Sequence, residues 1–210
     1  MWFTRNKPEE KKEDPPALGR FPLTLPEAEA AFVRDTYSKV DTILEYGSGG
    51  STKLAAGLGK NCISVESDKE WAETLNSTLA ADFGESSGVK VLHVDLGPTG
   101  NWGYPTDMSN WARFWRYPLA VWQDDPKPDP DIVLIDGRMR KACFAATMMN
   151  IHRNTRVLVD DYADRPHYHD IESFVKPTEM AGRLAVFDLA PAALDAADFQ
   201  RILPWFFEIR

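Results

Sequence analysis

Short apolar runs alternate with segments of helical spacing along most of this chain. The runs predict buried strands at residues 42–45, 61–66, 89–94, 131–136, 156–160 and 183–189, with a last strand near 206–209. Helices are expected between them, at residues 24–38, 52–58, 67–79, 141–150 and 168–174. Thr24 and Glu27 have the spacing of a capping box, and Ser67 is placed to cap the third helix. Strands that alternate with helices indicate an α/β fold with a mostly parallel sheet covered on both faces.

Composition fits one ordinary globular domain. The 210 residues are 43% apolar and 27% charged, with a net charge of −8. Such a field repels a phosphate polymer, which argues against nucleic acid as a partner. Residues 1–17 are charged and contain prolines, so we expect a disordered tail before a single domain at 18–210. No signal peptide or membrane-spanning run is evident, and the two cysteines are too few for a disulfide scaffold, so the sequence predicts a cytoplasmic protein with no membrane partner.

The turn after the first strand is rich in glycine. It reads Glu45-Tyr-Gly47-Ser48-Gly49-Gly-Ser51 and leads directly into a helix. Glycines let a backbone approach a ligand closely, and the free N–H groups of a helix start face an anion. Thr52 stands where a dinucleotide fingerprint has its third glycine. Glu45 suits an ammonium better than a pyrophosphate, which indicates a ligand with an amine, a carboxylate and a ribose.

Two later strands also end in acids. Glu66 follows Glu45 by 21 residues, at the end of the second strand, and a carboxylate there can accept both hydrogen bonds of a ribose diol. Asp95 follows the third strand. The carboxyl ends of parallel strands share one edge of a sheet, which is where ligands bind in such folds.

Taken together, the glycine turn, Glu66 and Asp95 resemble motifs I to III of the class I S-adenosylmethionine-dependent methyltransferases. The resemblance implies a three-layer Rossmann-like fold whose seven-stranded sheet has one antiparallel strand near the C-terminus. It implies that Glu45 and the turn from Gly47 to Ser51 hold the methionine end of S-adenosylmethionine. It also implies that Glu66 holds the ribose and that Asp95 lies near the adenine. Asp136, at the end of the fourth strand, is a further candidate for the cofactor site. The alternative is a glycine-containing turn with no ligand.

Three carboxylates are expected to converge beside this site. Asp136 ends the fourth strand, and Asp160 and Asp161 end the fifth. Like charges this close repel unless a proton or a cation intervenes, and ligation by oxygen alone suits Mg²⁺. The pattern resembles the divalent-metal-dependent O-methyltransferases of the catechol and macrolide-sugar types, in which the metal holds an acceptor's hydroxyls. Where the catechol type has a lysine base, this chain has Met139. The alternative is that these acids cap turns or contact the acceptor without metal.

The remaining candidates concern the acceptor. An aromatic-rich insertion at about residues 97–130 holds four of the seven tryptophans, and it is either a binding loop or a packed segment or homodimer contact. Arg138, Arg140 and Lys141 either clamp an acidic acceptor or neutralise the three aspartates. His167 is a candidate general base, with Asp136 and Arg138 as the other catalytic candidates.

These observations predict methyl transfer from S-adenosylmethionine to a small molecule, at a hydroxyl, with Mg²⁺ as a possible second cofactor. Two alternatives stay open. One is a cofactor-binding or regulatory protein of the same fold without turnover. The other is a nicotinamide-dependent oxidoreductase, which the missing third glycine disfavours.

Overall fold

The computed structural model describes residues 21–84 and 87–209, and the predicted tail at 1–17 lies outside them. A single seven-stranded sheet with the strand order β3-β2-β1-β4-β5-β7-β6 forms the middle layer. The first five strands in this order are parallel, and β7 runs antiparallel to both of its neighbours. The strands are β1 Thr42–Tyr46, β2 Asn61–Glu66, β3 Val89–His93, β4 Ile132–Ile135, β5 Thr155–Val159, β6 Glu179–Ala181 and β7 Leu184–Leu189. The predicted fold class is confirmed.

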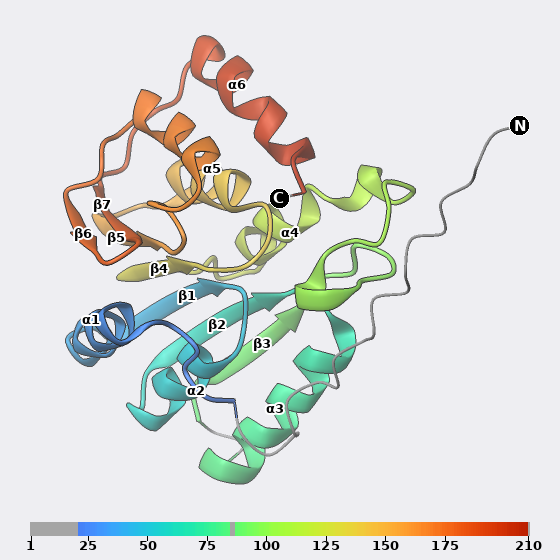
Figure 1. Cartoon of the computed structure of the whole chain (residues 1–210), viewed down its shortest axis with the longest axis vertical. Coiled ribbons are helices and arrows are strands. Elements are labelled where there is room, and N and C mark those ends of the chain that lie inside the picture. The colour runs from blue at the N-terminus through green and yellow to red at the C-terminus, as the bar shows by residue number, and fades with distance from the viewer. Residues whose placement is uncertain (1–20, 85–86, 210) are drawn as a thin grey trace, which may run out of the picture.

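Helices cover both faces of the sheet (Figure 1). One face carries α1 Glu27–Ser38, α2 Gly50–Gly57 and α3 Lys69–Phe83, and the other carries α4 Arg116–Leu119, α5 Arg140–Asn150 and α6 Ala196–Ile202. Because side chains alternate along a strand, β1 contributes core residues to both faces of the sheet. Ile43 packs under α1 and α2, whereas Leu44 and Tyr46 pack under α5. All four residues of β4 are buried, as expected for a central strand with two covered faces.

The C-terminal region differs from the prediction. Residues 206–209 form no strand; instead a 3₁₀ helix, Leu203–Phe207, follows α6. Pro204 fits the start of such a helix and cannot donate to a strand ladder, and the Asp195 carboxylate caps α6 by accepting from the Asp198 N–H at 2.8 Å. The seventh strand is β6, a three-residue hairpin partner of β7 that is too short to show a period of its own.

Two predicted helix caps are wrong. Helix α1 follows Pro26 without any side-chain cap, so Thr24 and Glu27 do not form a capping box. Helix α3 is capped by Asp68, whose carboxylate accepts from the Trp71 N–H at 2.9 Å. The Ser67 hydroxyl instead donates to the Gly103 carbonyl at 2.9 Å. That bond ties the end of β2 to the insertion.

The aromatic insertion is packed at its base and exposed at its tip. Phe114, Tyr117 and Trp122 are buried, and Trp122 donates its indole N–H to the Tyr46 hydroxyl at 2.7 Å. Trp102, by contrast, is 82% exposed. The segment contains α4 and three short 3₁₀ helices, so it is an ordered cover over the carboxyl edge of the sheet. Among the described residues, no helix is both long and apolar enough to cross a membrane.

Candidate active site at the carboxyl edge of the sheet

The glycine turn presses directly against the end of β4. Gly47 has a φ of +96°, and a Cβ there would lie 2.7 Å from the Gly137 Cα. A Cβ on Gly137 would in turn lie 2.2 Å from the Tyr117 hydroxyl. Both positions therefore require glycine, for backbone conformation or for space. This contact fixes the predicted cofactor turn beside Asp136.

Glu45 does not face the ligand side of this turn, contrary to our prediction. Its side chain is completely buried between α1 and α2, where Oε1 accepts from the Tyr37 hydroxyl at 2.8 Å and Oε2 accepts from the Thr52 hydroxyl at 2.5 Å. Burial raises the pKa of Glu45, although the hydrogen bonds from Thr52 and Tyr37 oppose the rise. The strand alternation that places Ile43 under the helices places Glu45 there too. Glu45 braces the turn through these two hydrogen bonds, and its side chain has no exposed surface.

Glu66 lies where the sequence predicted it, and it is held firmly. Oε2 accepts from the Ser48 N–H at 3.2 Å and the Ser48 hydroxyl at 2.9 Å, while Oε1 accepts from the N–H groups of Ser67 and Asp68 at 2.7 and 2.9 Å. A Cβ on Gly103 of the insertion would lie 3.2 Å from Oε1. A ribose diol that binds Glu66 must therefore replace the Ser48 hydroxyl at Oε2. It would also lie against Gly103 of the insertion, which is next to Oε1.

The other predicted cofactor residues line the same edge. Ser48, Gly49 and Ser51 are half-buried at the start of α2, and the Ser48 carbonyl accepts from the Trp71 indole at 2.9 Å. Asp95 is exposed beyond β3, where it pairs with Arg113 at 2.8 Å. A hydrogen bond from the Gly97 N–H, with help from Arg113, lowers the pKa of Asp95.

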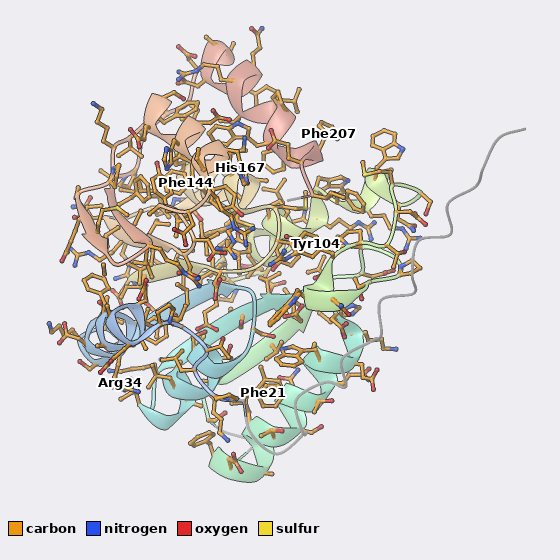
Figure 2. The ribbon with its side chains drawn as sticks, in the orientation of Figure 1. Phe21, Arg34, Tyr104, Phe144, His167 and Phe207 are labelled. Atoms are coloured by element: carbon orange, nitrogen blue, oxygen red, sulfur yellow. The ribbon has the colours of Figure 1, made fainter. Side chains whose placement is uncertain are left out.

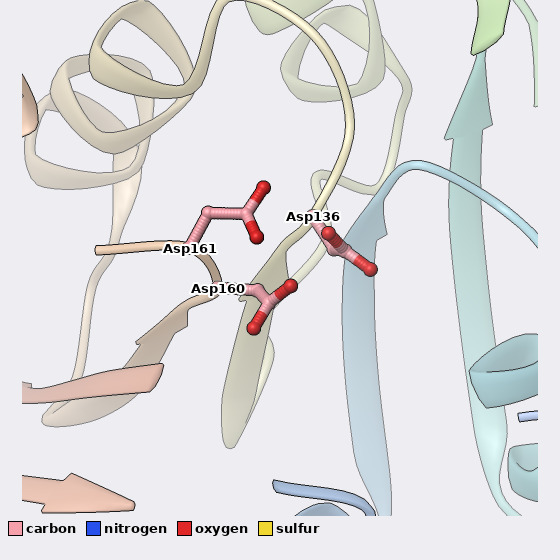
Figure 3. A group of neighbouring side chains, drawn as sticks. All are labelled: Asp136, Asp160 and Asp161. Atoms are coloured by element: carbon pink, nitrogen blue, oxygen red, sulfur yellow. The ribbon is translucent and has the colours of Figure 1, made fainter. Parts of the chain in front are cut away.

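The three aspartates converge as the sequence predicted. Asp136 extends from the end of β4, and Asp160 and Asp161 extend from the end of β5 toward it (Figure 3). One oxygen of each carboxylate lies within 4.8 Å of the others. The neighbouring parallel strands β4 and β5 produce this arrangement.

Arginines, however, already neutralise these carboxylates. Arg140 lies 3.1 Å from both Asp136 and Asp161, Arg183 lies 2.8 Å from Asp160, and Arg165 lies 2.9 Å from Asp161. Three guanidinium groups thus occupy the space and supply the charge that a divalent cation would supply. The predicted Mg²⁺ set Asp136, Asp160 and Asp161 does not fit a resident metal for this reason.

We expect Mg²⁺ to have no specific effect on the stability of this protein. A cation bound at 100 times its Kd would stabilise the fold by about 2.7 kcal/mol. The measurement is the melting temperature in 10 mM MgCl₂ against NaCl of equal ionic strength, with MnCl₂ as a second cation. A saturable rise that Asp160→Asn abolishes would show that the aspartates bind metal despite their arginines.

Asp136 is the most strongly perturbed accessible acid of the site. Its side chain is half-buried, and burial raises its pKa to about 7 against the pull of Arg140, while Asp160 and Asp161 add to the rise. A carboxylate with a pKa near neutrality is well matched to take a proton from an acceptor hydroxyl.

The cations after β4 separate into different roles. Arg140 is part of the aspartate network, whereas Lys141 pairs with Asp170 and Glu208 at 2.7 and 2.8 Å. Arg138 takes neither role. Its guanidinium stacks on the ring of Tyr104, 4.0 Å from the ring centroid. The expectation that all three cations offset the aspartates therefore holds for Arg140 alone.

His167, the histidine that the sequence suggested as a general base, does not lie on the turn after β4 that carries Asp136. His167 is exposed on the 3₁₀ helix Pro166–Ser173, where its ring is 4.2 Å from that of Tyr168 (Figure 2). Tyr104 of the insertion, which the sequence analysis did not single out, lies instead at the carboxyl edge beside Arg138 and Arg165. Only its place in an aromatic-rich insertion hinted at such a position. Met139 is buried with a φ of +52° at the start of α5.

Comparison with known structures identifies the family. A methyltransferase-like protein from Silicibacter pomeroyi is 41% identical, with a TM-score of 0.85 over 90% of this chain and 98% of that one. The chain belongs to the class I methyltransferase family. A methyltransferase from Geobacter sulfurreducens shares the fold at 10% identity, with a TM-score of 0.52 over 79% of this chain and 80% of that one. No protein-family model and no protein of curated function matches the sequence.

This membership confirms the resemblance drawn from the glycine turn and the strand-end acids. The methyltransferase fold accounts for the position of each feature: the turn after β1, the acid after β2 and the acid after β4 all reach one edge. At this edge the three aspartates are paired with arginines.

Proposed function

We propose that this methyltransferase transfers a methyl group from S-adenosylmethionine to a hydroxyl of a small molecule, with Asp136 as the general base. The observation that carries the proposal is the contact between the glycine turn and the end of β4. It holds Asp136, with its pKa raised to about 7, beside the place where the cofactor's sulfonium would lie.

The residues fit this cofactor in two ways. The turn from Gly47 to Gly49 packs against the backbone of Gly137, and helix α2 begins directly after it, so the free N–H groups of the helix start are available to an anionic group of the cofactor. Glu66 offers a carboxylate that already accepts from a hydroxyl, that of Ser48. Exchanging this hydroxyl for a ribose hydroxyl keeps the number of hydrogen bonds unchanged, so ribose binding costs little there.

In the proposed reaction the hydroxyl oxygen attacks the methyl carbon as the carbon–sulfur bond breaks. The hydroxyl proton moves to Asp136, and S-adenosylhomocysteine leaves as a neutral thioether. Arg140 keeps the Asp136 carboxylate in place through its contact at 3.1 Å. The buried aromatic base of the insertion closes the edge above β2 and β4 and limits the access of water to the reacting atoms.

Calorimetric titration with S-adenosylhomocysteine tests the cofactor assignment. We expect saturable binding that weakens at least about tenfold in Glu66→Gln, because hydrogen bonds to a charged carboxylate contribute about 1.5–3 kcal/mol. Glu70→Gln, an exposed change on α3, is the matched control and should bind as the wild type does. Binding of NADH without any binding of S-adenosylhomocysteine would contradict the proposal and favour an oxidoreductase.

A further inference from the structure

Arg138 is a buried cation that lacks a counterion. Arg138 is only 8% exposed. Within the described part of the chain, no carboxylate oxygen lies within 4.0 Å of its guanidinium nitrogens. Its Nε is buried, and no residue that the structure describes forms a hydrogen bond with it. A buried charge and an unsatisfied donor are both costly, so such a group is expected to serve a ligand.

The neighbouring charges do not supply the missing partner. Asp136, Asp160 and Asp161 are matched by three other arginines, and Arg138 pairs with none of them. Glu66 is the nearby acid on β2, and its two oxygens already accept from Ser48, Ser67 and Asp68. In a chain whose net charge is −8, an unmatched guanidinium at the active site is a local exception.

Tyr104 holds the guanidinium in a defined position. The centroid of its ring lies 4.0 Å from the Arg138 guanidinium carbon, and Arg165, which pairs with Asp161, is a second guanidinium close enough to lower the pKa of Tyr104. Burial alone would raise the pKa of Tyr104, but Arg138 and Arg165 outweigh it and hold the pKa below its usual value. Stacking uses the face of a guanidinium and leaves its N–H edge for a planar anion.

We propose that Arg138, held by Tyr104, binds a carboxylate or phosphate group of the methyl acceptor. The acceptor is then a small acid that also carries a hydroxyl. Arg138 follows Asp136 by two residues, on the turn that packs against Gly47, so an anion bound there places the rest of the acceptor beside Asp136 and the glycine turn. This inference rests on the proposed function and adds the chemical class of its substrate.

Titration with inorganic phosphate, observed on arginine side chains by ¹⁵N–¹H NMR, tests the site without knowledge of the acceptor. In the wild-type protein the Arg138 Nε–H signal, assigned with Arg138→Lys, should shift saturably both without cofactor and with saturating S-adenosylhomocysteine. We expect phosphate to bind Arg138→Gln at least tenfold more weakly. Arg156→Gln, an exposed arginine paired with Asp188, is the matched control and should change nothing.

Two outcomes would overturn the proposal. The first is an Arg138 signal that does not respond to phosphate, a result that stands even if Arg138→Gln fails to fold. The second is displacement of phosphate by S-adenosylhomocysteine but not by 5′-methylthioadenosine, which lacks the cofactor's carboxylate. That result would assign Arg138 to the cofactor's carboxylate. Failure of the wild-type protein to bind S-adenosylhomocysteine at all is a separate result and contradicts the proposed function.

Discussion

Replacing Asp136 with asparagine should lower kcat for methyl transfer about 10²–10⁴-fold, the range that a general base contributes. Asparagine has nearly the same shape but cannot take the acceptor's proton. The measurement is transfer of labelled methyl from S-adenosylmethionine to whichever member of a panel of small hydroxy acids turns over. Asp35→Asn, an exposed change on α1, is the control and should retain full activity.

The pH profile makes this prediction specific. Burial and the neighbouring Asp160 and Asp161 raise the pKa of Asp136 to about 7, against the pull of Arg140. The base must be ionised to work, so kcat/KM should rise as pH increases through about 7 and level off above it. Asp136→Asn should lose this rise. A variant that keeps both the rate and the pH profile would show that another group takes the proton.

The strand-end acids were predictable because their positions follow from topology. Apolar runs locate the strands and parallel strands end at one edge, so Glu66, Asp136 and Asp160 lie along that edge, where Asp136 and Asp160 come together. The burial of Glu45 could also have been predicted from the sequence. It lies in β1, a strand covered on both faces, and Thr52 in place of a third glycine supplies the hydroxyl that it accepts from. Thr52 thus has a structural explanation that the motif comparison alone did not give.

The arginine network was not predictable from local sequence. Arg183 precedes β7 and Arg165 follows β5, yet both reach the acids at the end of β5. Such pairings depend on the tertiary structure, so of the three arginines only Arg140 was among the partners that the sequence offered for these acids, and a metal stayed open beside it. The C-terminal helix was missed for a different reason. The short apolar run at 206–209 cannot be distinguished from a strand by its period.

Replacing Arg140 with methionine should lower the free energy of unfolding by about 3–5 kcal/mol, the range for breaking a buried ion pair by removing one partner. The Arg140 side chain is 3% exposed, contacts Asp136 and Asp161 at 3.1 Å, and donates to the carbonyls of Gly137 and Asp160 at 3.1 and 2.5 Å. It therefore joins the ends of β4 and β5. Urea denaturation measures the loss, and Arg156→Met, which breaks an exposed pair, should cost about 1 kcal/mol or less.

A second measurement shows whether the loss comes from unpaired charge. Without Arg140, the carboxylates of Asp136 and Asp161 face each other with less positive charge between them, so Asp161→Asn should destabilise the Arg140→Met background less than the wild type. Mg²⁺ should likewise stabilise Arg140→Met although it has no specific effect on the wild-type protein, because the freed oxygens suit a hard cation. Equal effects of Mg²⁺ on both proteins would show that Arg140 does not occupy the place of a metal. Stabilisation of Arg140→Met alone by Mg²⁺ would show that the Arg140 guanidinium is what prevents the three aspartates from binding a metal.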